Sequence, residues 1–169
     1  MDILELIKSR RSIREFTAEP VAEADINRIL EAGRWAPSAN NSQPCKFIVV
    51  RRQEARQRLA DVMPTGYFLP AAQVAVAVVV DPEASKRCIE DGAAATQNML
   101  LEAHSLGLGA CWIGCYGTEK EVGGKEVLEI PEEKRLQCVI AIGRPAESPE
   151  AKERKPLEEM TFKEKYGRR

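Results

Sequence analysis

The chain has 169 residues, of which 44% are hydrophobic and 30% are charged, and its formal net charge is −1. This length predicts one domain spanning residues 1–169, and the composition excludes an intrinsically disordered chain. The balance of charges argues against a general nucleic-acid binder, and the longest apolar run, 74–80, is too short to cross a membrane. We therefore expect neither nucleic acid nor membrane as a partner.

Cysteine and histidine usage predicts a reducing environment. The five cysteines are odd in number and scattered in spacing, so no disulfide framework is expected. The single histidine, His104, leaves no common zinc-ligand set, and we expect no metal. A cytoplasmic location follows from these two observations.

The first part of the chain shows two helical patterns separated by an extended segment. Apolar residues recur at helical spacing in 2–9 and in 22–34, whereas strict alternation in 10–16 favours extended backbone. The second helix should stop before Pro37, because proline disfavours helix in the residue that precedes it. Residues 39–44 are polar and irregular and predict a loop.

The rest of the chain alternates strands with helices. We expect strands at 47–50, 74–80, 110–113 and 137–142, helices at 53–62 and 84–106, and a loop at 63–70. The run 74–80 has no polar face, which is typical of a central strand covered on both sides. The pattern predicts an α/β or α+β layered fold. The charged tail from 146 carries scattered apolar residues, so it either frays or packs on another surface such as a second subunit.

Four stretches could carry chemistry, although each also has an ordinary structural explanation. The run 10–14 places guanidinium groups and a hydroxyl together, which suits a phosphate, but solvated basic strands are common. The loop 36–44 offers amide and hydroxyl groups for the edge of a heterocycle, or is simply a helix stop with an Asx turn. The stretch 107–116 contains a strand that ends in glycine, whose open backbone N–H groups could bind a ligand. Its ordinary explanation is a buried strand. The cluster 152–157 is a second cationic group or a solvated tail.

Other familiar motifs are absent. Gly107 and Gly109 begin a dinucleotide-like pattern, but Trp112 stands at the third glycine and the glycines follow a helix. Gly123, Gly124 and Lys125 are followed by Glu126 rather than Ser or Thr, which excludes a P-loop.

Taken together, the four stretches closely resemble the FMN-dependent nitroreductase family from about residue 2 to about residue 166. Their order and spacing match: an opening RRSIRxF, then APSxxNxQP, an Ala-rich helix leading into GLGxCWIG, an Ile-Gly-Arg-Pro strand end and a late RKPLEE. The resemblance implies an α+β fold with a mixed central sheet flanked by helices. It also implies a homodimer with two FMN sites at the interface, in which each C-terminal arm, about 150–169, packs on the partner.

The resemblance also implies residue roles. Arg14 would lie at the pyrimidine edge of the flavin and the Gly114 N–H near N5, and these two are the expected catalytic groups. Phosphate and ribityl contacts would come from Arg10, Ser12 and Arg154, with Lys152 or Lys155 assisting, while the opposite subunit would supply Pro37, Ser38 and Asn41. The full set of expected cofactor contacts is Arg10, Arg11, Ser12, Arg14, Pro37, Ser38, Asn41, Gln43, Trp112, Ile113, Gly114, Lys152, Arg154 and Lys155.

The implied activity is ping-pong hydride transfer from NADH or NADPH to a nitroaromatic, quinone or similar small acceptor. Two alternatives remain: a flavin-storing or partner-binding module without turnover, and a specialised flavin enzyme such as a dehalogenase. The chain departs from the family at Cys45, where tryptophan is frequent, and at Cys115, where a small residue is common. The segments 63–70 and 116–135 are short, which suggests an open substrate slot.

Overall fold

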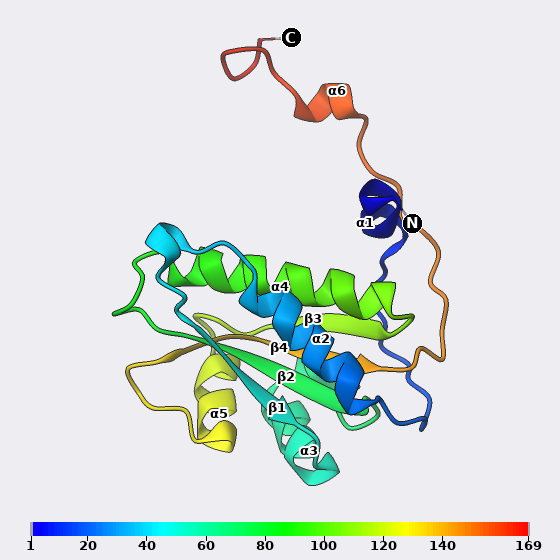
Figure 1. The fold of residues 1–169 in the computed structure, drawn as a ribbon, viewed down its shortest axis with the longest axis vertical. Coiled ribbons are helices and arrows are strands. Elements are labelled where there is room, and N and C mark those ends of the chain that lie inside the picture. Colours follow the sequence, from blue (N-terminus) through cyan, green and yellow to red (C-terminus); the bar gives the residue numbers. More distant parts are fainter. Residues whose placement is uncertain (1, 169) are drawn as a thin grey trace.

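The computed structural model describes residues 2–168 and is built around a four-stranded sheet (Figure 1). The strands β1 (Cys45–Val50), β2 (Val74–Val80), β3 (Gly109–Gly114) and β4 (Arg135–Gly143) lie in the order β1-β2-β4-β3. All three strand pairs are antiparallel. A mixed sheet was expected, but the one parallel pairing within the described residues is an isolated bridge between Ser12 and Ala110.

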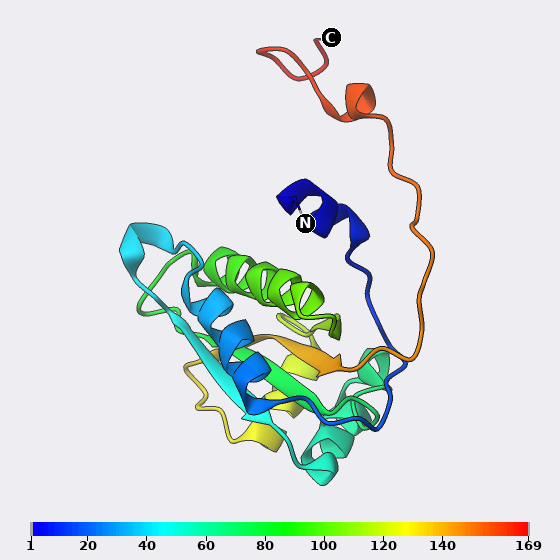
Figure 2. The same cartoon turned by 45° about the vertical axis from the view of Figure 1, so that its right-hand side comes forward.

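Helices cover both faces of this sheet (Figures 1 and 2). On one face α2 (Glu23–Arg34) and α4 (Cys88–Ser105) bury Ile26, Ile29 and Met99 against Val76 and Val78 of β2. On the other face lie α3 (Gln53–Val62) and α5 (Glu119–Leu128), which pack on the alternate β2 residues, 75, 77 and 79. The prediction of a central strand covered on both sides is confirmed.

One helix was not predicted. The segment 116–135, expected to be a short connection, contains α5, and the loop 63–70 contains the 3-10 turn η2 (Pro64–Gly66). The sequence did not predict α5 because this segment contains Gly123 and Gly124, and glycine weakens a helix by about 1 kcal/mol relative to alanine. Here a Cβ on Gly124 would overlap Met63 and Leu136, so the glycine permits close packing of α5 on its neighbours.

The N-terminal segment crosses the sheet over two facing glycines. Gly109 of β3 pairs with Gly143 of β4. A Cβ on Gly109 would lie 2.8 Å from Ile13 Cβ, and a Cβ on Gly143 would lie 2.8 Å from Phe16 Cδ1. The Ile13 N–H donates to the Ala110 carbonyl at 3.1 Å, so the segment that carries the arginine motif is held along β3.

A buried ion pair anchors α5 to β4. Glu121 is only 4% exposed and accepts hydrogen bonds from Arg135 Nε at 2.6 Å and Arg135 Nη2 at 2.7 Å. It also accepts from the Gly117 N–H at 2.7 Å and the Leu136 N–H at 3.2 Å. Burial alone raises the pKa of Glu121, but these hydrogen bonds outweigh it, and the net pKa lies below the ordinary value.

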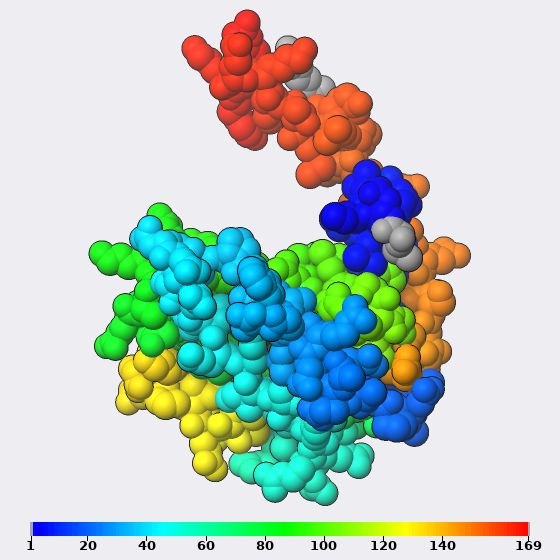
Figure 3. Space-filling model, in the orientation of Figure 1, coloured from blue at the N-terminus to red at the C-terminus, as the bar shows by residue number. Residues whose placement is uncertain are grey.

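The two chain ends expose apolar surface. The helix α1 (Ile3–Ser9) has no buried residue, and the tail with α6 (Leu157–Met160) stands away from the body (Figure 3). Leu157 is 73% exposed and Tyr166 is 95% exposed. The exchange of this arm with a partner remains a prediction. Among the helices described, none has the length and apolarity needed to cross a membrane.

Replacing Gly109 with alanine should shift the N-terminal segment. The new methyl group would overlap Ile13, and overpacking of this kind costs about 1–3 kcal/mol. We expect Gly109→Ala to lower the free energy of unfolding by that amount in urea denaturation. Gly107→Ala, at a position with no atom near the added Cβ but a φ of +72°, is the control for backbone strain alone. An unchanged Gly109→Ala stability would contradict the close approach.

Acid should weaken the anchor of α5. Because the folded-state pKa of Glu121 lies below its unfolded value of about 4.3, the ion pair stabilises fully above that pH and is lost as pH falls through the folded-state pKa. Glu121→Ala should cost about 3 kcal/mol at pH 7, the low end for buried pairs, since Arg135 stays 36% exposed. In urea denaturation, the difference in unfolding free energy between wild type and Glu121→Ala should be smaller at pH 3 than at pH 7. An equal difference at both pH values would contradict the role given to the ion pair.

Candidate functional site

Both ends of the chain line one cavity of about 680 Å³. The N-terminal segment contributes one wall and the arm that follows β4 contributes the other. The tie between the walls is a short antiparallel pairing, in which the Thr17 N–H donates to the Arg144 carbonyl at 2.9 Å and the Ala146 N–H to the Glu15 carbonyl at 2.9 Å. Figure 2 shows these two segments meeting beside the sheet. The predicted residues in the lining are Arg10, Arg11, Ser12, Arg14, Lys152 and Arg154.

Most of the cations that line this cavity have no carboxylate partner among the described residues, although Lys8 pairs with Glu5 at 3.1 Å and Glu150 also lies in the lining. Within residues 2–168 no carboxylate forms an ion pair with Arg10, Arg14, Lys152 or Arg154. Arg11 Nη1 donates to the Lys8 carbonyl at 2.6 Å, at the end of α1, and its buried Nε has no partner among the described residues. A group of unpaired guanidinium and ammonium ions around one cavity suits a multiply charged anion such as a phosphate ester.

Arg14 is held through its backbone and leaves its side chain available. Its N–H donates to Glu147 Oε1 at 2.5 Å, and its guanidinium lies over the Phe68 ring at 5.9 Å from the centroid. The ring and the charge attract each other weakly at this distance. The side chain of Arg14 is therefore exposed at the edge of the cavity.

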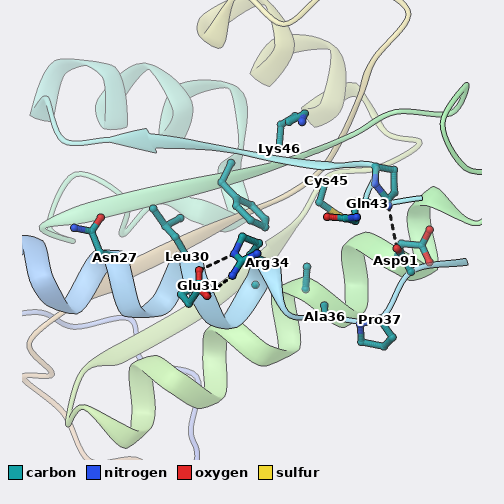
Figure 4. A pocket seen from close by; sticks show the side chains of 15 residues that line it. Asn27, Leu30, Glu31, Arg34, Ala36, Pro37, Gln43, Cys45, Lys46 and Asp91 are labelled. Atoms are coloured by element: carbon teal, nitrogen blue, oxygen red, sulfur yellow. Dashed lines mark hydrogen bonds and ion pairs between the residues drawn. The ribbon is translucent and has the colours of Figure 1, made fainter. Parts of the chain in front are cut away.

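The loop after α2 lines a different cavity, of about 610 Å³, shown in Figure 4. Pro37, Ser38 and Gln43 lie on its wall, whereas Asn41 does not. The two cavities share no lining residue, although both lie along α4, with Gln97 in the first and Asp91 in the second. In one copy of the chain the loop and the arginine segment therefore do not meet.

The loop itself has an unusual backbone. Asn40, Asn41 and Gln43 have φ values of 54°, 55° and 49°, in the left-handed region. Such backbone costs of order 1 kcal/mol or more per residue and persists only where neighbours impose it. The buried Asp91 accepts the Ala39 N–H at 3.1 Å and the Ser85 hydroxyl at 2.7 Å, and the Ser38 hydroxyl accepts the Gln43 N–H at 3.0 Å, so hydrogen bonds tie the loop on either side of the asparagines.

The end of β3 separates two residues that the resemblance placed together. Trp112 is half-buried against the α2 and α4 cluster, while Ile113 is 2% exposed in the cluster on the opposite face. Strand alternation causes this, so Ile113 can offer a ligand only its backbone. Gly114 is exposed, and its carbonyl accepts a long hydrogen bond from Lys120 of α5 at 3.5 Å.

Several residues of the site were missed by sequence reasoning. Glu147, Asp91 and Lys120 act on backbone or loop groups far away in the chain, and no local pattern signals that role. Of the two lysines considered as phosphate contacts, Lys152 lines the first cavity and Lys155 does not.

The cysteines behave as structural residues. Cys115 donates to the Leu136 carbonyl at 3.3 Å, and burial, with Glu121 nearby, raises the pKa of its thiol to about 12. Burial, with Asp91 and Cys88 nearby, raises the pKa of Cys45 to about 11. Both thiols are therefore protonated and unreactive at neutral pH. In the described part of the chain, His, Cys, Asp and Glu form no group of three suited to a metal ion.

Known proteins share both the sequence and the fold. The model of the nitroreductase family matches residues 7–67 and 64–144. A protein of Methanothermobacter thermautotrophicus, provisionally named NADH dehydrogenase/NAD(P)H nitroreductase, is 43% identical over 88% of this chain and 80% of its own length. A protein of the same name from Archaeoglobus fulgidus is 39% identical over 85% and 86%.

Solved structures agree with this relationship. A provisionally named nitroreductase of Desulfovibrio desulfuricans, solved with FMN, is 36% identical, covers 98% of both chains and superposes with a TM-score of 0.85. The NADPH:FMN oxidoreductase of Vibrio harveyi, solved with NAD+, is 27% identical, with a TM-score of 0.87 over 96% of this chain and 77% of its own. The predicted α+β fold is confirmed, and the chain belongs to the nitroreductase family of enzymes.

Proposed function

We propose that the chain is an oxidoreductase that binds FMN, accepts hydride from NADH or NADPH and reduces a nitroaromatic, quinone or similar small acceptor. The observation that carries the proposal is the cavity in which Arg10, Arg14, Lys152 and Arg154, from both chain ends, have no ion-pair partner among residues 2–168. The FMN complex of the Desulfovibrio desulfuricans relative and the NAD+ complex of the Vibrio harveyi relative support the choice of cofactor and of hydride donor.

The residues of this chain fit the proposed cofactor. Arg10, Ser12, Lys152 and Arg154 would hold the phosphate and ribityl chain, and the unpartnered Nε of Arg11 is a further donor at that wall. A hydrogen bond to a charged group contributes about 1.5–3 kcal/mol, so several together would retain the cofactor tightly.

Bound FMN would supply the hydride chemistry, and the protein would position it and stabilise charge. Arg14 would place a fixed positive charge at the pyrimidine edge, where reduction adds negative charge, and Phe68 keeps its guanidinium at the cavity rim. The exposed Gly114, last in β3, would offer its backbone N–H. No acid–base side chain is required, which accords with the single histidine of the sequence.

A ping-pong order suits a single slot used in turn by donor and acceptor. The chain has no separate dinucleotide fingerprint, and Gly107 and Gly109 follow α4 rather than a strand. Lys120 Nζ of α5 lies 3.2 Å from Thr65 Oγ1 of η2, and we propose that these two elements form a wall beside the end of β3, next to the slot that the sequence predicts to be open. We propose a cytoplasmic setting, in which the five free thiols would stay reduced.

We further propose that residues 1–169 form a single domain and that the enzyme is a homodimer. In this dimer each copy would pack its arm, 150–169, on the other copy. Three features support this assembly. The edge strand β1 pairs only with β2 among the described strands. The helices α1 and α6 expose apolar side chains. The loop with Pro37, Ser38, Asn41 and Gln43 lies outside the arginine-lined cavity of its own chain, so it is available to the cavity of a partner.

The direct test is flavin colour under anaerobic conditions. Protein purified with FMN should be yellow and should bleach when NADH or NADPH is added. Arg14→Ala should slow this reduction by about 100-fold at full flavin occupancy, as expected for loss of one preorganised charge. Arg58→Ala, at an exposed position of α3, is the matched arginine control.

Each other result selects a different function. Yellow protein that does not bleach would indicate a storage or partner-binding module. Reoxidation by only one acceptor of a panel would indicate a specialised flavin enzyme. Colourless protein that takes up no added FMN would overturn the proposal.

Charged substitutions on the arm should dissociate the dimer. Leu157→Asp combined with Tyr166→Asp would remove two large apolar contacts, each contributing about 1.5–3 kcal/mol. We expect the dimer dissociation constant to rise by at least about 100-fold in sedimentation velocity, which is the low end for the two contacts of a single arm. Lys163→Asp, which changes charge on the same arm without removing apolar surface, should have a much smaller effect. An unaltered dimer in the double variant would exclude arm exchange.

A further inference from the structure

Glu147 joins the N-terminal segment to the arm at the cationic cavity. Its Oε1 atom accepts the N–H of Arg14 at 2.5 Å and the N–H of Glu15 at 3.1 Å. The side chain is half-buried, and no ion pair of Glu147 is present within residues 2–168. Its carboxylate therefore serves the backbone of the arginine segment rather than a cation.

This contact is the last tie between the two walls of the cavity. The ladder before it consists of Thr17 N–H to the Arg144 carbonyl and Ala146 N–H to the Glu15 carbonyl. After Glu147, no described hydrogen bond joins residues 148–155 to the N-terminal segment. The distance between Arg10 and Arg14 on one wall and Lys152 and Arg154 on the other thus depends on where Glu147 fixes the start of the arm.

We propose that Glu147 is a positioning residue that sets the spacing of the two cationic walls, and thereby the affinity of the site for the phosphate of FMN. The inference rests on the proposed function, in which both walls contact that phosphate. A phosphate bound from two sides needs both sets of donors at fixed separation, because an anchored donor costs less ordering entropy on binding.

The sign of the effect separates positioning from charge. A carboxylate beside an anion site repels the anion, so its removal would strengthen phosphate binding if charge were its only influence. Positioning has the opposite consequence: loss of the acceptor frees the arm and weakens phosphate binding. Glutamine keeps an oxygen that can accept both N–H groups but carries no charge.

The experiment compares FMN with riboflavin, which lacks the phosphate. Flavin-free wild-type protein, Glu147→Ala and Glu147→Gln are titrated with each compound, and binding is followed by quenching of flavin fluorescence. We expect Glu147→Ala to bind FMN at least about 10-fold more weakly, as for loss of one charge-assisted contact. The loss for riboflavin should be clearly smaller, because the Ile13 N–H still holds the Arg14 segment on β3 through the Ala110 carbonyl. Glu147→Gln should restore most of the FMN affinity. Glu153→Ala, on the exposed arm, should not weaken FMN binding.

Several results would overturn the inference. One is that Glu147→Ala binds FMN as tightly as the wild type or more tightly. Another is that its affinities for FMN and riboflavin fall equally, which would indicate a general structural role for Glu147. If Glu147→Ala fails to fold by circular dichroism, Glu147→Asp tests the same point, since its shorter side chain cannot reach both N–H groups and should give a smaller loss of the same kind. Failure of wild-type protein to bind FMN would instead refute the proposed function.

Discussion

The close approach of the N-terminal segment to a pair of facing glycines is the constraint on which the cationic cavity depends. Ile13 and Phe16 occupy the space that side chains at Gly109 and Gly143 would need. The arginine segment can therefore lie against β3 and β4 at the point where β4 ends and the arm begins. Two stretches about 140 residues apart in sequence become the two walls of one cavity through local packing and a few backbone hydrogen bonds.

This arrangement keeps like charges together at a cost. Arg10, Arg14, Lys152 and Arg154 repel one another, and within residues 2–168 no carboxylate pairs with them. Elsewhere the chain does pair its charges, as the buried Glu121 and Arg135 show. The contrast is understandable if an anion completes the cavity, because a ligand that binds only the folded state adds its binding free energy to stability.

The sequence allowed prediction of features that repeat along the chain, and not of those that depend on distant contacts. The stripe Ile26 and Ile29, and the all-apolar run of β2, follow from burial on one or both faces. Helix α5 escaped prediction because Gly123 and Gly124 are explained only by packing against α3 and β4. Glu147 and Asp91 escaped because each binds backbone N–H groups that no spacing rule connects to it.

The proposed homodimer would explain several features that one copy of the chain leaves incomplete. The loop 36–44 has left-handed backbone at Asn40, Asn41 and Gln43, and it lies outside the arginine-lined cavity of its own chain. The arm carries exposed apolar residues, and β1 has an open edge. In a twofold dimer every contact between the two copies occurs twice, so a loop that completes one cationic cavity also completes the other. Backbone strain in an exposed loop is retained where a neighbour requires that shape, and a second copy of the chain would supply such a neighbour.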